Sequence, residues 1–151
     1  MAEARKFNPV ASVTGPIYLL LFPIPIALFL AALITDVVYS SNSVIMWAHF
    51  SSWLIAAGLV LGLLPVIASL VELIASHALR STVLGWGHIF LFWATMIIEL
   101  FNMLIHTRDG WTSVVPTGLI LSIIACIVGL AAVATLFFVP LSWTSRREAH
   151  S

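Results

Sequence analysis

Residues 82–106, TVLGWGHIFLFWATMIIELFNMLIH, form an apolar run that carries polar side chains at helical spacing. Its ionisable and amide members are His88, Glu99, Asn102 and His106. At about 100° per residue, these four fall within an arc of roughly 60° on one face of a helix. A charged side chain at the centre of a bilayer costs about 3 kcal/mol or more unless it is paired. The run therefore predicts a transmembrane helix whose polar face points into a bundle of helices.

The composition of the whole chain is also that of a membrane protein. Hydrophobic residues make up 62% of the 151 residues and charged residues only 8%. A soluble domain typically has about 25% charged residues, so these are too few to cover a water-exposed surface. The net charge of zero gives no basic surface for nucleic acid, and the single Cys126 excludes a disulfide within the chain. The lipid bilayer is the expected partner of most of the surface.

Three more apolar runs, at residues 17–39, 44–75 and 114–140, accompany the run at 82–106. Each is long enough to cross the hydrocarbon core of roughly 30 Å as a helix that rises about 1.5 Å per residue. Because the connections between the runs are short, successive helices should be antiparallel neighbours. We predict an all-α fold, a polytopic membrane protein in which residues 16–143 form an antiparallel bundle of four transmembrane helices.

Prolines and small residues predict local features of these helices. Pro23 and Pro25 should kink or loosen the first helix in its first half, and Pro65 should kink the second helix.

Gly58 and Gly62 have the four-residue spacing of small-residue pairs that let helices approach closely. Such a pair could serve packing inside the bundle or dimerisation, and we expect packing inside the bundle.

The basic residues predict the orientation in the membrane. If the N-terminus lies inside, the outer side holds Arg108 alone, and the inner side holds Arg5, Lys6, Arg80, Arg146 and Arg147. Basic residues are enriched on the cytoplasmic side of membrane proteins. We therefore expect both termini in the cytoplasm, with residues 1–15 and 144–151 as cytoplasmic end segments.

Two histidines on neighbouring helices predict a haem site. His49 and His106 both lie near the outer ends of adjacent antiparallel helices, and a bundle can hold a haem iron between two such imidazoles. We predict that they ligate the iron of a b-type haem, with Glu99 and Asn102 as hydrogen-bonding neighbours. Asp36 could join them around a transition metal such as iron or zinc. The alternative is that both histidines lie in the lipid headgroup layer.

His88 lies near the opposite end of the bundle, about 27 Å from His106 along the helix axis. It is a further candidate for cofactor binding, and the alternative is a hydrogen bond from His88 to Glu72 on the second helix. The fourth apolar run has no charged residue and no histidine between Val114 and Pro140. We expect this fourth helix to act as a scaffold.

The chain resembles the family catalogued as domain of unknown function 2231, which comprises small four-helix membrane proteins of bacteria. The resemblance spans about residues 15–140 and is carried by Phe22-Pro23-Ile24, Asp36, Gly58, Gly87-His88 and Asp109-Gly110. The family usually has a His-Pro ahead of its Phe-Pro-Ile, where this chain has Gly15-Pro16. Relatives are similar to membrane modules that are joined to, or found beside, periplasmic dehydrogenase and cytochrome-like domains. The resemblance therefore implies a place in the bacterial inner membrane, and electron transfer between a periplasmic partner and quinone or haem.

Three functions are compatible with these features. The first is an inner-membrane subunit that transfers electrons or anchors a periplasmic redox partner, with b-type haem or quinone as its cofactor. The second is a haem-free structural or regulatory subunit. The third is a small conductor of protons or solutes that uses Glu72, His88 and Glu99. We do not expect the chain to be an enzyme on its own, because its connections are too short for a soluble active site. We expect it to bind other subunits of a membrane complex or further copies of itself.

Overall fold

The computed structural model of the chain describes residues 17–75, 83–108 and 114–136. They form four α-helices, labelled α2 (Pro23–Asn42), α3 (Ile45–Ala75), α5 (Val83–His106) and α6 (Thr117–Leu136). Each helix contributes to a stretch that is long and apolar enough to cross a membrane: Ile17–Asn42, Ile45–Val71, Gly85–His106 and Thr117–Thr135. The prediction of an all-α membrane protein with four transmembrane helices is confirmed.

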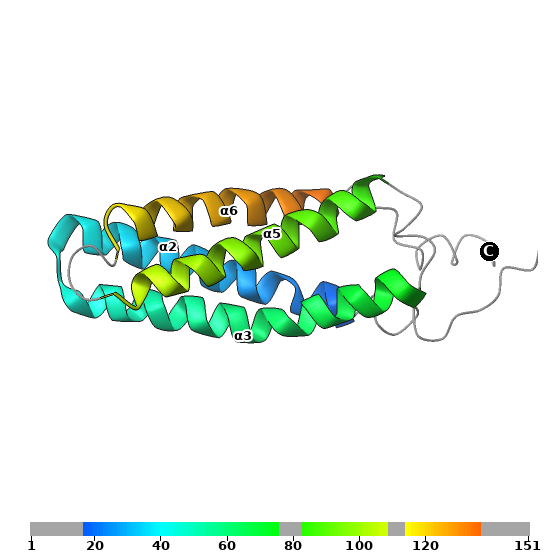
Figure 1. Cartoon of the computed structure of the whole chain (residues 1–151), viewed down its shortest axis with the longest axis horizontal. Helices are drawn as coiled ribbons and strands as arrows, with labels where there is room; N and C mark the ends of the chain where they lie inside the picture. The colour runs from blue at the N-terminus through cyan, green and yellow to red at the C-terminus, as the bar shows by residue number, and fades with distance from the viewer. Residues whose placement is uncertain (1–16, 76–82, 109–113, 137–151) are drawn as a thin grey trace, which may run out of the picture.

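The helices form an elongated bundle in which each packs against two others (Figure 1). α2 contacts α3 and α6, and α5 contacts the same two helices from the opposite side, so α2 and α5 face each other diagonally. Successive helices run in opposite directions, as the short connections predict (Figure 1). We call the two ends of the bundle the His106 end and the His88 end, after residues of α5.

The end segments predicted at 1–15 and 144–151 lie outside the described residues. The same holds for every Lys and Arg except Arg108. Because the predicted orientation depends on these basic residues, it stays a prediction.

The first span is broken at the position that its prolines predict. Residues 17–21 are helical, Phe22 forms a turn, and α2 begins at Pro23. The Phe22 N–H still donates a hydrogen bond to the Tyr18 carbonyl, at 2.8 Å. Pro23 and Pro25 lack an N–H, and the first turn of a helix is where this absence is tolerated. Phe22 is therefore held at a break between two helical segments.

Gly58 and Gly62 face the inside of the bundle, as we expected. The ring of Phe29 from α2 lies directly against Gly58, where it occupies the space that a Cβ would need. At Gly62 a Cβ would come within 2.5 Å of the Met96 Cε atom of α5. Both glycines thus let side chains of neighbouring helices approach the axis of α3. Packing within one chain therefore explains why both positions are glycine.

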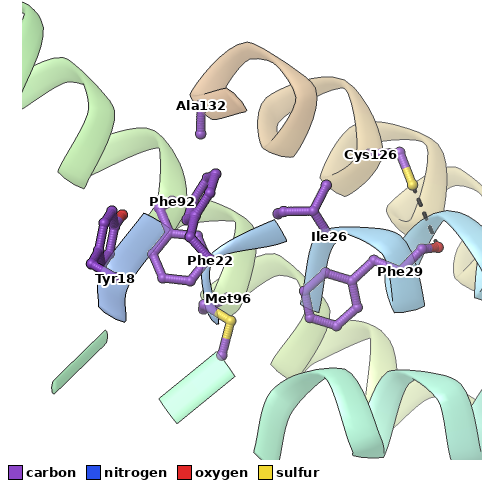
Figure 2. Packing of buried hydrophobic residues seen from close by; sticks show 8 residues of the cluster. All are labelled: Tyr18, Phe22, Ile26, Phe29, Phe92, Met96, Cys126 and Ala132. Carbon is purple, nitrogen blue, oxygen red and sulfur yellow. Dashed lines mark hydrogen bonds between the residues drawn. The ribbon is translucent and has the colours of Figure 1, made fainter. Parts of the chain in front are cut away.

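The apolar core is richest in aromatic rings near the His88 end (Figure 2). The rings of Phe22 and Phe92 are both inaccessible to solvent, and their centroids lie 4.8 Å apart in a T-shaped arrangement. We call these two rings the aromatic layer. Outside the bundle, large apolar side chains such as Trp53 and Phe90 are exposed, as expected for residues that contact lipid.

Candidate functional site

The predicted polar face of α5 points into the bundle. His88, Glu99, Asn102 and His106 are all buried, with exposed fractions between 0% and 7%. The last three lie toward the His106 end and contact polar residues from the other three helices. Together they form what we call the polar cluster: Asp36, Ser51, Glu99, Asn102, His106 and Ser122.

A buried contact between Asp36 and His106 is the centre of the polar cluster. The His106 Nε2 atom lies 3.0 Å from Asp36 Oδ1, and Nδ1 lies 3.0 Å from the Asn102 carbonyl oxygen. Because a carbonyl can only accept, Nδ1 carries a proton and donates it to Asn102. The contact with Asp36 holds another proton, as either imidazolium with carboxylate or imidazole with carboxylic acid. The Ser51 hydroxyl lies farther from Nε2, at 3.3 Å.

A chain of hydrogen bonds connects Asp36 to Glu99 through two neutral side chains. The Ser122 hydroxyl donates to Asp36 Oδ2 at 2.5 Å. The Asn102 amide group then donates one hydrogen bond to Ser122 Oγ, at 2.8 Å, and another to Glu99 Oε2, at 3.0 Å. Both N–H donors of Asn102 are therefore used, and they fix the orientation of its amide.

Two oxygen atoms of the polar cluster have no hydrogen-bond partner among the described residues. They are Glu99 Oε1 and Asn102 Oδ1, and both residues are fully buried. An unpaired buried acceptor typically costs about 1–3 kcal/mol. Since Asn102 already directs its amide group to Glu99 Oε2, these two acceptors need a donor that the described hydrogen bonds do not supply. That donor would be a proton on Glu99 or a small bound molecule.

His88 belongs to a separate group of polar residues at the other end of the bundle. Its Nε2 atom lies 2.5 Å from the Tyr18 hydroxyl, and Nδ1 lies 2.9 Å from the Ala132 carbonyl oxygen and 3.0 Å from Thr135 Oγ1. The side chain of Glu72 lies outside the described part of the structure, so the expected hydrogen bond from His88 to Glu72 on the second helix stays a prediction. The two ring nitrogens of His88 are engaged by Tyr18, in the helical residues 17–21 that precede α2, and by α6.

The structure does not bring His49 and His106 together as a pair of haem ligands. His49 is exposed on α3, whereas both ring nitrogens of His106 are engaged by oxygen atoms inside the bundle. A haem iron held by two histidines needs one free imidazole nitrogen on each side. Among the described residues, no group of three or more His, Cys, Asp or Glu side chains could hold a metal ion. The haem site stays a prediction, and these residues do not fit it.

The hydroxyl groups that complete both sites were not predicted from the sequence. Ser122 shows that α6 is more than a scaffold, because this helix supplies the link between Asp36 and Asn102. Ser51 and Tyr18 were missed in the same way. A serine in a helix commonly bonds to its own backbone, as Ser52 does, so its residue type alone does not reveal a partner on another helix.

A family model described as "Predicted membrane protein (DUF2231)" matches residues 14–139. The chain belongs to this family. The match covers all four helices of the DUF2231 protein, and with them both groups of polar residues. No curated protein and no solved structure matches the chain. The resemblance inferred from the sequence is confirmed, and the family description extends to a membrane protein and no further.

Proposed function

We propose that this membrane protein is a slow proton conductor that binds and releases protons at the polar cluster. One observation carries the proposal: three ionisable side chains, Asp36, Glu99 and His106, are buried in one cluster with an unpaired carboxyl oxygen among them. Ionisable groups inside membrane proteins commonly belong to ion or proton pathways, because their burial is otherwise costly.

A purely structural role explains only part of the polar cluster. Helices can be held together by hydroxyl and amide groups, and the hydrogen bond from Asn102 to Ser122 already joins α5 to α6. Carboxyl and imidazole groups in the same place add a desolvation cost of several kcal/mol per ion. What they add chemically is the ability to gain and lose a proton.

Glu99 is the group that we propose exchanges protons. With a proton on Oε1, its carboxyl group becomes a donor, and Asn102 Oδ1 is a buried acceptor without a partner on the adjacent turn of α5. An acid and an amide can pair through two hydrogen bonds, one of which is present here from Asn102 Nδ2 to Glu99 Oε2. When the proton leaves, the negative charge lies in the same cluster as His106, which can carry a positive charge.

Proton flux into liposomes tests this proposal. The full chain is reconstituted with a pH-sensitive dye inside the vesicles, and a potassium diffusion potential drives proton entry. We expect a flux above that of protein-free liposomes, and its loss in Glu99→Gln, which keeps the shape of the side chain without an exchangeable proton. Glu148→Gln makes the same chemical change outside the four spans and should keep the wild-type rate. Equal rates for wild type and Glu99→Gln, or no wild-type flux, would overturn the proposal.

Binding of a membrane quinone is a second candidate function, and one observation favours it. An apolar groove of about 370 Å³ lies between α3 and α5, and its lining includes Leu59, Leu63, Trp93, Met96 and Leu100. Ligand pockets typically have volumes of about 300–1,000 Å³, so the groove is large enough for part of a quinone. A bound quinone would quench the fluorescence of Trp93. Quenching that persists unchanged in Trp93→Phe would count against this candidate, and Trp53→Phe, on the lipid-exposed surface, is the control.

A further inference from the structure

The hydrogen bonds around His88 determine which ring nitrogen carries its proton. The Thr135 hydroxyl donates to the Ala132 carbonyl at 2.7 Å, so Thr135 Oγ1 can only accept from His88. The Ala132 carbonyl is also an acceptor. The His88 Nδ1 atom therefore carries a proton and shares it between these two oxygens, at 2.9 and 3.0 Å. In the neutral ring, Nε2 must then accept a hydrogen bond.

The Tyr18 hydroxyl can satisfy Nε2 of His88 in either protonation state. It lies 2.5 Å from Nε2, and the exposed fractions of Tyr18 and His88 are only 9% and 2%. A tyrosine hydroxyl both donates and accepts. The Tyr18 hydroxyl donates to Nε2 when the ring is neutral. When Nε2 gains a proton, the Tyr18 O–H rotates away, and the hydroxyl oxygen accepts a hydrogen bond from the imidazolium. Protonation of His88 therefore reverses the direction of this hydrogen bond and leaves both ring nitrogens with a partner.

We infer that His88 and Tyr18 form a second proton-binding site, at the opposite end of the bundle from the polar cluster. Its role as a second proton-binding site on the conduction path rests on the proposed function. Among the described residues hydrogen-bonded to His88, Tyr18 is the group that can titrate, while α6 presents uncharged oxygens. Phe22 adds an apolar ring whose centroid lies 4.9 Å from that of the imidazole. Glu72 lies in the last turns of α3, at the same end of the bundle.

The aromatic layer separates this second site from the polar cluster. Phe92 is one turn beyond His88 on α5, and Glu99 lies about 16 Å from His88 along the helix axis. Figure 2 shows the rings of Phe22 and Phe92 side by side, between Tyr18 and the rest of the apolar core. No hydrogen bond among the described residues connects the two sites across these rings. Each site therefore binds its proton separately, and transfer between them requires the aromatic layer to move or to admit water.

Nitrogen NMR of the full chain in lipid bilayers, with ¹⁵N-labelled histidine, tests the second site. Lowering the pH should convert His88 Nε2 from the unprotonated to the protonated chemical shift, while Nδ1 stays protonated throughout. In Tyr18→Phe the midpoint of this transition should move to lower pH by about one unit. Both forms of the ring lose a hydrogen bond to Tyr18, but the bond to the charged ring is the stronger one, so the imidazolium is destabilised more. Tyr39→Phe removes the other tyrosine hydroxyl of the chain and should leave the midpoint unchanged. Helix content measured by circular dichroism confirms that each variant is folded.

The outcomes separate this inference from the proposed function. An Nε2 atom of His88 that keeps one chemical shift over the whole pH range would overturn the second site, and so would an unchanged midpoint in Tyr18→Phe. Neither result depends on proton flux or on Glu99. Conversely, a His88 transition that persists in Glu99→Gln supports two independent sites, even if the flux assay fails.

Discussion

The Oδ1 atom of Asp36 lies 3.0 Å from Nε2 of His106, although the two residues are 70 positions apart in the chain. Their side chains are completely buried. Because α2 and α5 face each other diagonally, this contact crosses the middle of the bundle rather than joining neighbouring helices. The polar cluster around this contact joins residues of all four helices.

Removal of one partner should destabilise the bundle strongly. We expect Asp36→Asn to lower the free energy of unfolding by about 3–5 kcal/mol, because it leaves His106 buried without the carboxyl group that shares its proton. The loss is measured by denaturant titration in detergent micelles. The double variant Asp36→Asn/His106→Gln should lose less than the sum of the two single variants. Strictly additive losses would mean that the two side chains do not interact in the folded protein.

Ser122 should contribute more to stability than other serines of the spans. Ser122→Ala removes the donor to Asp36 Oδ2 and the acceptor for Asn102, so a loss of about 1–3 kcal/mol is expected. Ser52→Ala is the matched control, since the Ser52 hydroxyl donates only within α3, to Ala48. It should change stability by less than about 0.5 kcal/mol. Similar losses for the two variants would contradict the role assigned to Ser122.

Two glycines should respond in opposite ways to the same substitution. In Gly58→Ala the new methyl group would collide with the ring of Phe29, and overpacking of this kind typically costs about 1–3 kcal/mol. At Gly87, apart from its chain neighbours and the backbone of its own helix, no atom of the described residues lies within 4 Å of the corresponding position. Gly87→Ala should therefore be neutral, or stabilising by up to about 1 kcal/mol through helix propensity. Thermal unfolding of both variants in the same detergent compares them, and a Gly58→Ala variant as stable as wild type would disprove the close approach.

The aromatic layer should limit proton flux through the bundle. Phe22→Ala removes one of its two rings at the break before α2, where water could then enter between His88 and the polar cluster. We expect the flux into liposomes to rise several-fold. Phe90→Ala removes a ring of the same size from the exposed surface of α5 and should leave the flux unchanged. A flux in Phe22→Ala no greater than in wild type would show that this ring is not the barrier.

Visible absorption tests the haem prediction directly. Because His49 is exposed and both ring nitrogens of His106 are engaged, we expect no Soret band that depends on this pair in protein purified from haem-replete cells. The measurement compares the spectrum of wild type with those of His49→Ala and His106→Ala. A Soret band that both substitutions abolish would show that the two histidines ligate haem, and that α3 and α5 rearrange to bind it.

The number of helices and the inward direction of the polar face could both be predicted from the sequence. Apolar runs of sufficient length determine the spans, since the hydrocarbon requires every backbone group to be satisfied within a helix. Helical periodicity places His88, Glu99 and His106 on one face, and all three are buried as expected. Pro23 predicts the break at Phe22 for an equally local reason, because proline lacks the N–H that a continuous helix would use.

Only the tertiary structure decided which side chains meet across the bundle. An inward-facing residue such as His106 could contact any of three other helices, and the choice depends on how far each helix is rotated and shifted along its axis. Hydropathy and spacing leave this rotation and shift undetermined. Similar depth in the membrane therefore predicts a pair of His106 with His49, whereas the packed helices bring His106 to Asp36. The same relative placement brings Tyr18 to His88 and gives Ser122 a partner beyond its own helix.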